Sequence, residues 1–182
     1  MALNHYSFLI MSYFGNGKKF GVKINYSTEK KPLGTIGPLK IIKNLPENFL
    51  VLNGDILTNI NFKKYYNLHI KNNKNLSVCT FQRKQKIDYG ILEMKKNILQ
   101  NFKEKPSLNL NVSMGIYFIN KKILKNIKNK FFGFDDLMKY TLKNKIEVNI
   151  LPFKGMWYDI GRIEDYDYVN SNHNKILKKI NF

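Results

Sequence analysis

The sequence predicts an α/β fold with a mixed, mostly parallel sheet flanked by helices. Helical and strand patterns alternate in the first half of the chain, and strand patterns cluster in the second half. The apolar run at 49–52 leads directly into Asn53-Gly54-Asp55, as in a buried strand of a parallel sheet. A chain of 182 residues can bury a proper core, and we expect residues 1–182 to form a single domain.

Each element follows from hydrophobic periodicity and from glycine or proline at its ends. The cluster Gly15-Asn16-Gly17 ends the first helix, and apolar residues at helical spacing mark the helix that begins at Asn61. We expect helices over 6–14, 36–44, 61–72, 121–126, 134–144 and 163–179. We expect strands over 21–26, 49–52, 76–81, 89–94, 98–103, 112–119 and 147–152.

Two aspartates stand beside glycine at opposite ends of the chain. Asp55 follows the apolar run, and Asp159 lies in Trp157-Tyr158-Asp159-Ile160-Gly161. Ligands bind off the carboxyl ends of strands in open α/β sheets. Mg²⁺ accepts one or two carboxylates and takes its other ligands from water and phosphate. The pair therefore suggests metal-assisted phosphoryl chemistry, although a plain turn would also explain Asp55, and a helix N-cap would explain Asp159.

The net charge of +18 has two explanations. It could reflect a polyanionic partner, such as nucleic acid or a membrane surface. It could equally reflect a composition rich in Lys, Asn and Ile throughout. The lysines are scattered, and Arg83 and Arg162 are the only arginines. Because nucleic-acid binders favour arginine for bidentate contacts, we predict no nucleic-acid partner, although the charge should attract phosphorylated small molecules.

The sequence also indicates the cellular compartment. No apolar run approaches the roughly 18 residues of a membrane span, so no membrane partner is predicted. Residues 1–20 lack the pattern of a secretory signal. A single cysteine, Cys79, excludes intramolecular disulfides, which fits a cytoplasmic location. The three histidines lack zinc-site spacing and are expected on the surface or on helices: His5, His69 and His173.

Six segments occur in an order that resembles the sugar-1-phosphate nucleotidyltransferases, also called nucleoside-diphosphate-sugar pyrophosphorylases. They cover nearly the whole chain. Mannose-1-phosphate and heptose-1-phosphate guanylyltransferase-like members are the most similar. The segments are Glu29-Lys30-Lys31-Pro32-Leu33-Gly34-Thr35-Ile36-Gly37, Leu52-Asn53-Gly54-Asp55, Asp88-Tyr89-Gly90-Ile91-Leu92-Glu93, Lys103-Glu104-Lys105-Pro106, Ser113-Met114-Gly115-Ile116-Tyr117, and Trp157-Tyr158-Asp159-Ile160-Gly161-Arg162 with Glu164-Asp165-Tyr166.

This resemblance implies a Rossmann-like fold of the nucleotide-diphospho-sugar transferase type and a specific reaction. A sugar 1-phosphate attacks the α-phosphorus of an NTP, and pyrophosphate leaves. By resemblance, Asp55 and Asp159 would hold Mg²⁺, and Lys105 would pair with the sugar phosphate and contribute to catalysis. Glu104 would accept hydrogen bonds from sugar hydroxyls. A solvated Lys-Glu-Lys turn before Pro106 is the alternative for the last two residues.

The resemblance also assigns the remaining binding positions. Glu29 could accept hydrogen bonds from the donor edge of guanine, which favours GTP as the NTP. Gly90 would let the backbone approach the sugar, although a simple strand-start glycine is the alternative. Ser113 stands where many members carry asparagine, which leaves the identity of the sugar open. Nucleotide-binding positions are Glu29, Gly34, Thr35 and Gly54, and further sugar-binding positions are Gly90, Ser113, Gly115 and Trp157.

One part of the family pattern has no counterpart in these 182 residues. The family opens with a strand and a loop of the form Gly-Gly-x-Gly-Thr-Arg-Leu, which cradles the triphosphate, whereas residues 1–14 resemble the second strand and its helix. We therefore expect a truncated member that lacks the first strand and the nucleotide loop and is inactive alone. The alternative is a catalytically dead fragment or a non-enzymatic partner chain of the same fold. The sequence leaves a homo-oligomer open.

Overall fold

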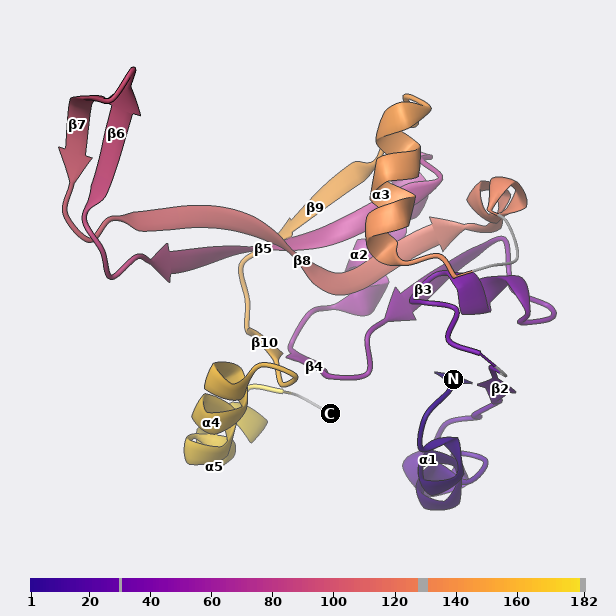
Figure 1. Ribbon diagram of the computed structural model, residues 1–182. Helices are drawn as coiled ribbons and strands as arrows, with labels where there is room; N and C mark the ends of the chain where they lie inside the picture. Colours follow the sequence, from indigo (N-terminus) through magenta and orange to yellow (C-terminus); the bar gives the residue numbers. More distant parts are fainter. Residues whose placement is uncertain (30, 128–130, 181–182) are drawn as a thin grey trace. The chain divides into compact units, whose positions relative to one another are not determined.

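The computed structural model describes residues 1–29, 31–127 and 131–180 (Figure 1). No helix in these ranges is both long enough and apolar enough to cross a membrane. The helices and 3₁₀ turns (η) are α1 (Ser7–Phe14), η1 (Lys18–Phe20), η2 (Gly37–Lys40), α2 (Phe62–Asn72), η3 (Lys121–Asn126), α3 (Phe134–Lys143), α4 (Ile163–Ser171) and α5 (His173–Leu177). The strands are β1 (Ala2–Leu3), β2 (Ser27–Thr28), β3 (Asn48–Leu52), β4 (Ile56–Thr58), β5 (Leu76–Lys86), β6 (Ile91–Lys95), β7 (Ile98–Lys103), β8 (Ser107–Asn120), β9 (Asn149–Phe153) and β10 (Trp157–Asp159).

The strands form a four-stranded sheet of order β3-β8-β5-β9 and three two-stranded ladders. The β1–β2 ladder is parallel, whereas the β4–β10 and β6–β7 ladders are antiparallel. This mixture of strands and helices confirms the predicted α/β class. The short strands β4 and β10 were not expected, and they form the ladder that carries Asp55 and Asp159.

The chain divides into two compact units. Unit 1 contains Met1–Leu50, His69–Leu76 and Phe118–Asn149, and unit 2 contains Val51–Leu68, Ser77–Tyr117 and Ile150–Phe182. The expectation of a single domain over 1–182 stays a prediction. The division matters for the candidate site because residues predicted to contact the nucleobase lie in unit 1, whereas both aspartates lie in unit 2.

A buried histidine lies in the core of unit 1. His69, in the last turn of α2, is 1% exposed and stacks on Phe118 with ring centroids 6.0 Å apart. Its Nε2 lies 3.2 Å from Oδ1 of Asn48, which also accepts the Asn120 side-chain amide at 2.9 Å. Burial lowers the pKa of His69, since desolvation disfavours the imidazolium. The helical location was expected, but the burial was not.

Helix α1 leaves apolar side chains in solvent. None of its residues is buried, and Phe8, Leu9 and Tyr13 are 78%, 62% and 65% exposed. The helix ends where Gly15 adopts a positive φ of 53° and donates its N–H to the Met11 carbonyl at 2.9 Å.

The expected strand over 21–26 is wrong. Instead, the segment folds back on the preceding glycine cluster. The Val22 N–H donates to the Gly17 carbonyl at 3.2 Å, and the Ile24 N–H donates to the Asn16 carbonyl at 2.9 Å. The Tyr26 hydroxyl donates to the Gly15 carbonyl. These residues do alternate between apolar and polar, but their backbone groups form hydrogen bonds within a loop and do not pair with a neighbouring strand.

The expected helix over 36–44 is also wrong, because only the 3₁₀ turn η2 forms there. Pro38 has no N–H to donate, and the N–H groups of Ile36 and Gly37 both donate to the Phe132 carbonyl at 3.0 Å. Asn44 then adopts a left-handed φ of 61°. The turn is therefore held at its start by the distant Phe132 carbonyl, and the i→i+3 bonds Leu39 N–H to Ile36 and Ile41 N–H to Pro38 give it 3₁₀ rather than α-helical geometry.

Three further elements differ in length from the expectation. Strands β5 and β8 extend well beyond 76–81 and 112–119, and their far ends lead into the β6–β7 hairpin (Figure 1). The helix expected over 163–179 is divided at Asn172, which has a non-helical φ of −118°. The Asn172 side-chain amide donates to the Tyr168 carbonyl at 2.9 Å. A local side-chain hydrogen bond thus competes with continuation of the helix.

Candidate active site

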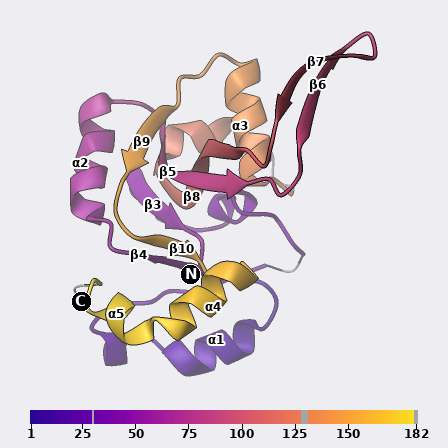
Figure 2. The ribbon, with the colours of Figure 1, turned by 90° about the vertical axis from the view of Figure 1, so that its left-hand side faces the viewer.

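Strand pairing brings Asp55 and Asp159 together in unit 2. Asp55 directly precedes β4, and Asp159 is the last residue of β10. In the antiparallel ladder Asp159 lies opposite Ile56, and the Ile160 N–H donates to the Asp55 carbonyl at 2.9 Å. Figure 2 shows β4 and β10 side by side, with α4 next to them. The pairing therefore places both aspartates at the same end of the ladder.

The two carboxylates approach the same point beside Gly161. A Cβ atom on Gly161 would lie 2.9 Å from Oδ2 of Asp55 and 3.2 Å from Oδ1 of Asp159. The two oxygens are therefore no farther apart than the sum of these distances. The Gly161 N–H also donates to Oδ1 of Asp159 at 3.2 Å. Glycine leaves open a space next to both carboxylates that any other side chain would enter.

This arrangement fits a hard divalent cation. Mg²⁺ binds one or two carboxylate oxygens at about 2.0–2.1 Å and keeps several waters, so a small gap flanked by two carboxylates suits it. Among the described residues, no group of three or more His, Cys, Asp or Glu side chains could hold a metal ion. A cation between Asp55 and Asp159 would therefore take its other ligands from water or phosphate, and the pair does not suit a closed zinc site.

Gly115 packs against the turn that carries Asp55. The Asn53 N–H donates to the Gly115 carbonyl at 3.0 Å, and Gly115 has a φ of +69°. A Cβ atom on Gly115 would lie 2.6 Å from Nδ2 of Asn53. The nearby Ser113 hydroxyl accepts the Gly115 N–H at 3.3 Å and donates to the Tyr117 hydroxyl at 3.3 Å. Packing alone explains this glycine, and sugar contacts by Ser113 and Gly115 stay predictions.

Trp157 lies in the core of unit 2 and fixes the start of β10. Its side chain is 7% exposed, and its indole N–H donates to the Met114 carbonyl at 3.0 Å. The Phe81 ring lies 5.4 Å away, and the Arg83 guanidinium lies 5.1 Å from the indole ring centroid. The structure thus gives Trp157 a packing role, and a contact with sugar stays a prediction.

Gly90 and Glu104 meet at the base of the β6–β7 hairpin. A Cβ atom on Gly90 would lie 2.7 Å from Cε2 of Phe102 and 3.2 Å from Oε2 of Glu104. Lys105 follows with a left-handed φ of 41° and an exposed side chain, in the turn before Pro106. Within the part of the chain that the structure describes, no residue that contacts Gly90 also contacts Gly161.

The predicted nucleobase loop lies in unit 1 and is closely packed. Oε2 of Glu29 accepts the Leu33 N–H at 2.8 Å, so this carboxylate holds the start of the loop. Gly34 has a φ of +78°, and its Cβ would lie 2.8 Å from the Phe132 carbonyl oxygen. Thr35 is exposed. Close backbone approach explains Gly34 without a ligand. Lys30 lies outside the described residues.

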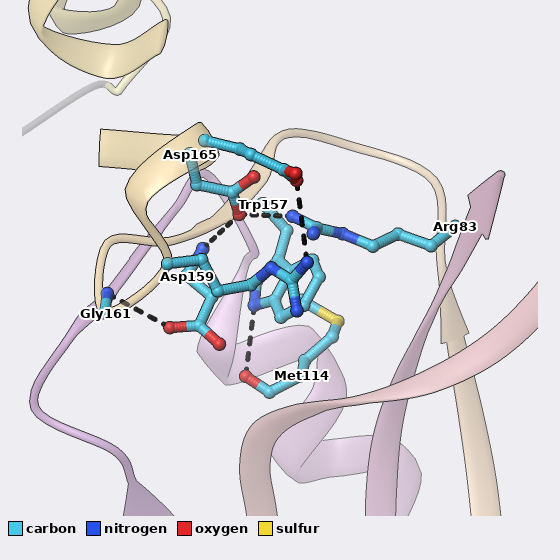
Figure 3. A network of polar contacts seen from close by, with 8 residues as sticks. Arg83, Met114, Trp157, Asp159, Gly161 and Asp165 are labelled. Atoms are coloured by element: carbon cyan, nitrogen blue, oxygen red, sulfur yellow. Dashed lines mark hydrogen bonds and ion pairs between the residues drawn. The ribbon is translucent and has the colours of Figure 1, made fainter. Parts of the chain in front are cut away.

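An ion pair that the sequence did not reveal supports the backbone of Asp159. Arg83 on β5 pairs with Asp165 on α4, and Oδ2 of Asp165 also accepts the Asp159 N–H at 2.9 Å (Figure 3). The side chains of Arg83 and Asp165 are 24% and 12% exposed. The available signals were that Arg83 is one of just two arginines in a lysine-rich chain, since arginine is preferred in buried ion pairs, and that Asp165 stands in a segment that carries the family resemblance.

Comparison with known proteins shows the family. Residues 1–176 match the family model described as nucleotidyl transferase. The chain belongs to the nucleotidyl transferase family. It is 30% identical over 155 residues to a mannose-1-phosphate guanylyltransferase catalytic subunit beta from Drosophila pseudoobscura pseudoobscura, with 81% of the chain and 42% of that relative covered. It is 29% identical over 156 residues to the same subunit from Dictyostelium discoideum, with 82% and 44% covered.

This nucleotidyl transferase chain thus spans less than half the length of the curated relatives it matches. Among solved structures, HddC from Yersinia pseudotuberculosis superposes with a TM-score of 0.70 at 21% identity, covering 94% of this chain and 76% of that one. HddC has also been crystallised with GMP-PN, and this second structure superposes with a TM-score of 0.65 at 22% identity and the same coverage. At this identity the superpositions show the shared fold.

The single cysteine of this nucleotidyl transferase is not poised for chemistry. Cys79 is fully buried in β5, and burial raises the pKa of its thiol to about 12. Since the thiolate is the reactive form, this thiol is inert at neutral pH.

Proposed function

We propose that this chain contributes the metal-binding and sugar-phosphate-binding part of an enzyme that transfers a nucleotidyl group from an NTP to a sugar 1-phosphate. The products would be an NDP-sugar and pyrophosphate, for synthesis of glycan or cell-surface polysaccharide precursors. Family membership supports the reaction class. The juxtaposition of the Asp55 and Asp159 carboxylates beside Gly161 is the observation that carries the proposal.

In this proposal Asp55 and Asp159 hold Mg²⁺. When bound, the ion would offset the negative charge of two phosphate groups that must approach each other. The open space at Gly161 and the accessibility of Asp55 leave room for phosphate oxygens and water beside the carboxylates. The Gly161 N–H orients the Asp159 carboxylate by donating to Oδ1. These two aspartates are the residues we assign to metal binding.

The hairpin base would bind the sugar 1-phosphate. Lys105 is exposed, and its flexible ammonium suits a phosphate as a point charge. Glu104 presents carboxylate oxygens that can accept from sugar hydroxyls, and Gly90 keeps the adjacent backbone open. Ser113, Gly115 and Trp157 complete the proposed sugar side, although their observed contacts are explained by packing. We assign the catalytic role to Lys105 together with the two aspartates.

GTP is the proposed nucleotide. Glu29 can accept from the N1–H and N2–H₂ donors of guanine with the oxygen that Leu33 does not occupy. Gly34, Thr35 and Gly54 are the other proposed nucleotide contacts. The relatives are named guanylyltransferases, and HddC was crystallised with GMP-PN. We further propose that the chain acts in the cytoplasm, because a single buried cysteine, Cys79, fits a reducing compartment. We also propose that it forms one domain and that it could form a homo-oligomer.

The test is isothermal titration of mannose 1-phosphate into the full chain in the presence of Mg²⁺. We expect binding that Lys105→Ala weakens about tenfold or more, because a hydrogen bond to a charged group contributes about 1.5–3 kcal/mol. Lys95→Ala is the matched control, since it removes one exposed lysine from the same hairpin. If the wild-type chain does not bind the sugar phosphate, or if both variants bind it as the wild type does, the sugar-phosphate assignment is wrong.

A further inference from the structure

We propose that Asp165, paired with Arg83, is a positioning residue that fixes the backbone of Asp159 and so keeps its carboxylate beside that of Asp55. The proposal rests on the proposed function of these two carboxylates as cation ligands. It assigns roles to two residues that do not themselves touch the cation. Asp165 lies in the first turn of α4, and Arg83 lies on β5.

The contact is made at the free edge of β10. Successive N–H groups of a strand point to opposite edges, and the Ile160 N–H donates to Asp55 across the ladder. The Asp159 N–H therefore faces the other edge. In the part of the chain that the structure describes, β10 pairs with β4 alone, and Oδ2 of Asp165 accepts this N–H at 2.9 Å. The Asp165 carboxylate thus takes the place of the carbonyl that a neighbouring strand would offer to the Asp159 N–H.

Arg83 offsets the desolvation cost of the buried Asp165 carboxylate. A charge removed from water needs a partner, and Asp165 is only 9% exposed. The Arg83 guanidinium pairs with the same Oδ2 atom and lies 5.1 Å from the Trp157 ring centroid (Figure 3). Trp157 is in turn held by the Met114 carbonyl at 3.0 Å. The acceptor for the Asp159 N–H is therefore fixed from several directions.

A helix-capping role alone does not explain Asp165. An acidic residue in the first turn of a helix interacts favourably with the helix dipole, and both Glu164 and Asp165 stand in the first turn of α4. Glu164 does this from the surface, with a side chain 82% exposed and its nearest ion-pair partner Arg162 at 3.5 Å. Only Asp165 turns inward to the Asp159 backbone. Glu164 therefore provides a matched control.

The experiment uses Mn²⁺ as a paramagnetic probe on the ¹⁵N-labelled full chain. Mn²⁺ broadens amide signals near its site, so binding is read at Ile56, Asp159 and Gly161, which surround the carboxylates. We expect Asp165→Ala to weaken Mn²⁺ binding about tenfold or more, as loss of a partner of a metal ligand does. We expect it also to speed hydrogen exchange of the Asp159 amide. Glu164→Ala should change neither quantity.

A second pair of variants separates positioning from stability. Asp165→Asn keeps an oxygen acceptor but leaves Arg83 without its counter-charge. In the double variant Arg83→Gln with Asp165→Asn, no buried charge is left unpaired while the acceptor remains. We expect the double variant to recover Mn²⁺ affinity to within about threefold of the wild type, even where its melting temperature stays lower. If Asp165 only stabilised the fold, Mn²⁺ affinity would not depend on whether residue 165 offers an oxygen to the Asp159 N–H.

The outcomes distinguish the two proposals. If the wild-type chain binds no Mn²⁺ at these amides, the proposed function of the carboxylate pair is wrong, and a positioning role toward that cation fails with it. If the wild type binds Mn²⁺ but folded Asp165→Ala binds it equally well, the positioning proposal alone is overturned. If Asp165→Ala does not fold, a folded double variant that binds Mn²⁺ more than tenfold more weakly than the wild type also overturns it.

Discussion

The carboxylates of Asp55 and Asp159 both approach the position that a side chain on residue 161 would occupy, which Gly161 leaves empty. A Cβ atom there would meet Oδ2 of Asp55 at 2.9 Å and Oδ1 of Asp159 at 3.2 Å. The β4–β10 ladder creates this relationship, since it places Asp159 opposite the residue that follows Asp55. The first prediction follows from this geometry.

We expect Gly161→Ala to weaken Mn²⁺ binding strongly, because the added methyl group would displace both carboxylates from their observed positions. Gly161 does not have a positive φ, so the backbone itself should tolerate alanine. The free energy of unfolding should change by less than about 0.5 kcal/mol, because Gly161 is exposed and the atoms that the methyl group would meet are carboxylate oxygens at the ends of side chains. Paramagnetic broadening by Mn²⁺ and urea unfolding measure the two effects.

Ile160→Ala is the control for that experiment, because it shortens an exposed side chain in the same turn without approaching the carboxylates. It should leave Mn²⁺ affinity unchanged. Equal affinities of the wild type and Gly161→Ala would contradict the assignment of a cation to the space beside Gly161.

Trp157→Phe should destabilise unit 2. The substitution removes the indole N–H that donates to the Met114 carbonyl, and Met114 is only 1% exposed. A buried acceptor left without its donor costs about 1–3 kcal/mol. Urea unfolding followed by circular dichroism should show this loss in the free energy of unfolding. Tyr89→Phe, at a side chain 79% exposed, should change it by less than about 0.5 kcal/mol. Equal effects of the two variants would show that the hydrogen bond is unimportant.

The chain should become less stable as the pH is lowered, because His69 titrates. Burial holds the pKa of His69 below its ordinary value of 6.5. As the pH falls through about 6.5, the unfolded chain takes up a proton that the native state still excludes. The native state therefore loses stability until the pH reaches the lowered pKa of His69. The free energy of unfolding, measured between about pH 8 and about pH 5.5, should decrease.

His69→Gln removes the titrating group while keeping a polar side chain that can reach Asn48. Its free energy of unfolding should depend less steeply on pH over the same interval. If both proteins show the same slope, His69 does not account for the dependence, and surface carboxylates or other groups must do so.

The exposed apolar face of α1 should drive self-association of the chain. Phe8 and Leu9 are 78% and 62% exposed, and contiguous exposed apolar surface promotes association. The double variant Phe8→Ser with Leu9→Ser should sediment as a smaller species than the wild type at high concentration. Ser12→Ala on the same helix should sediment as the wild type does. Association that persists unchanged in the double variant would place the contact elsewhere.

Several features could be predicted from the sequence because they depend on local patterns. The helices α2 and α3 and the strands β3, β7 and β9 lie close to their expected positions, since hydrophobic periodicity and flanking glycine or polar residues are local signals. The α/β class followed from the order of these elements. The candidate cation ligands Asp55 and Asp159 were also visible, because each stands beside a glycine at the end of an apolar segment.

Other features depended on contacts outside the segment itself. The segment 21–26 alternates like a strand, but its backbone bonds to the nearby Gly15-Asn16-Gly17 cluster. Residues 36–44 form only a 3₁₀ turn that the Phe132 carbonyl holds at its start. The burial of His69 depends on Phe118 and Asn48. In each case a partner outside the segment decided the structure.

The sequence by itself therefore determined the class of fold, most of the longer elements and the two carboxylates suited to a cation. Only the tertiary structure decided that β4 and β10 pair, that Gly161 leaves space next to both Asp55 and Asp159, and that Arg83 and Asp165 support the Asp159 backbone. The physical reason is that periodicity reports which face of an element is apolar. It does not report which distant backbone group or charge will be within hydrogen-bonding distance once the chain has folded.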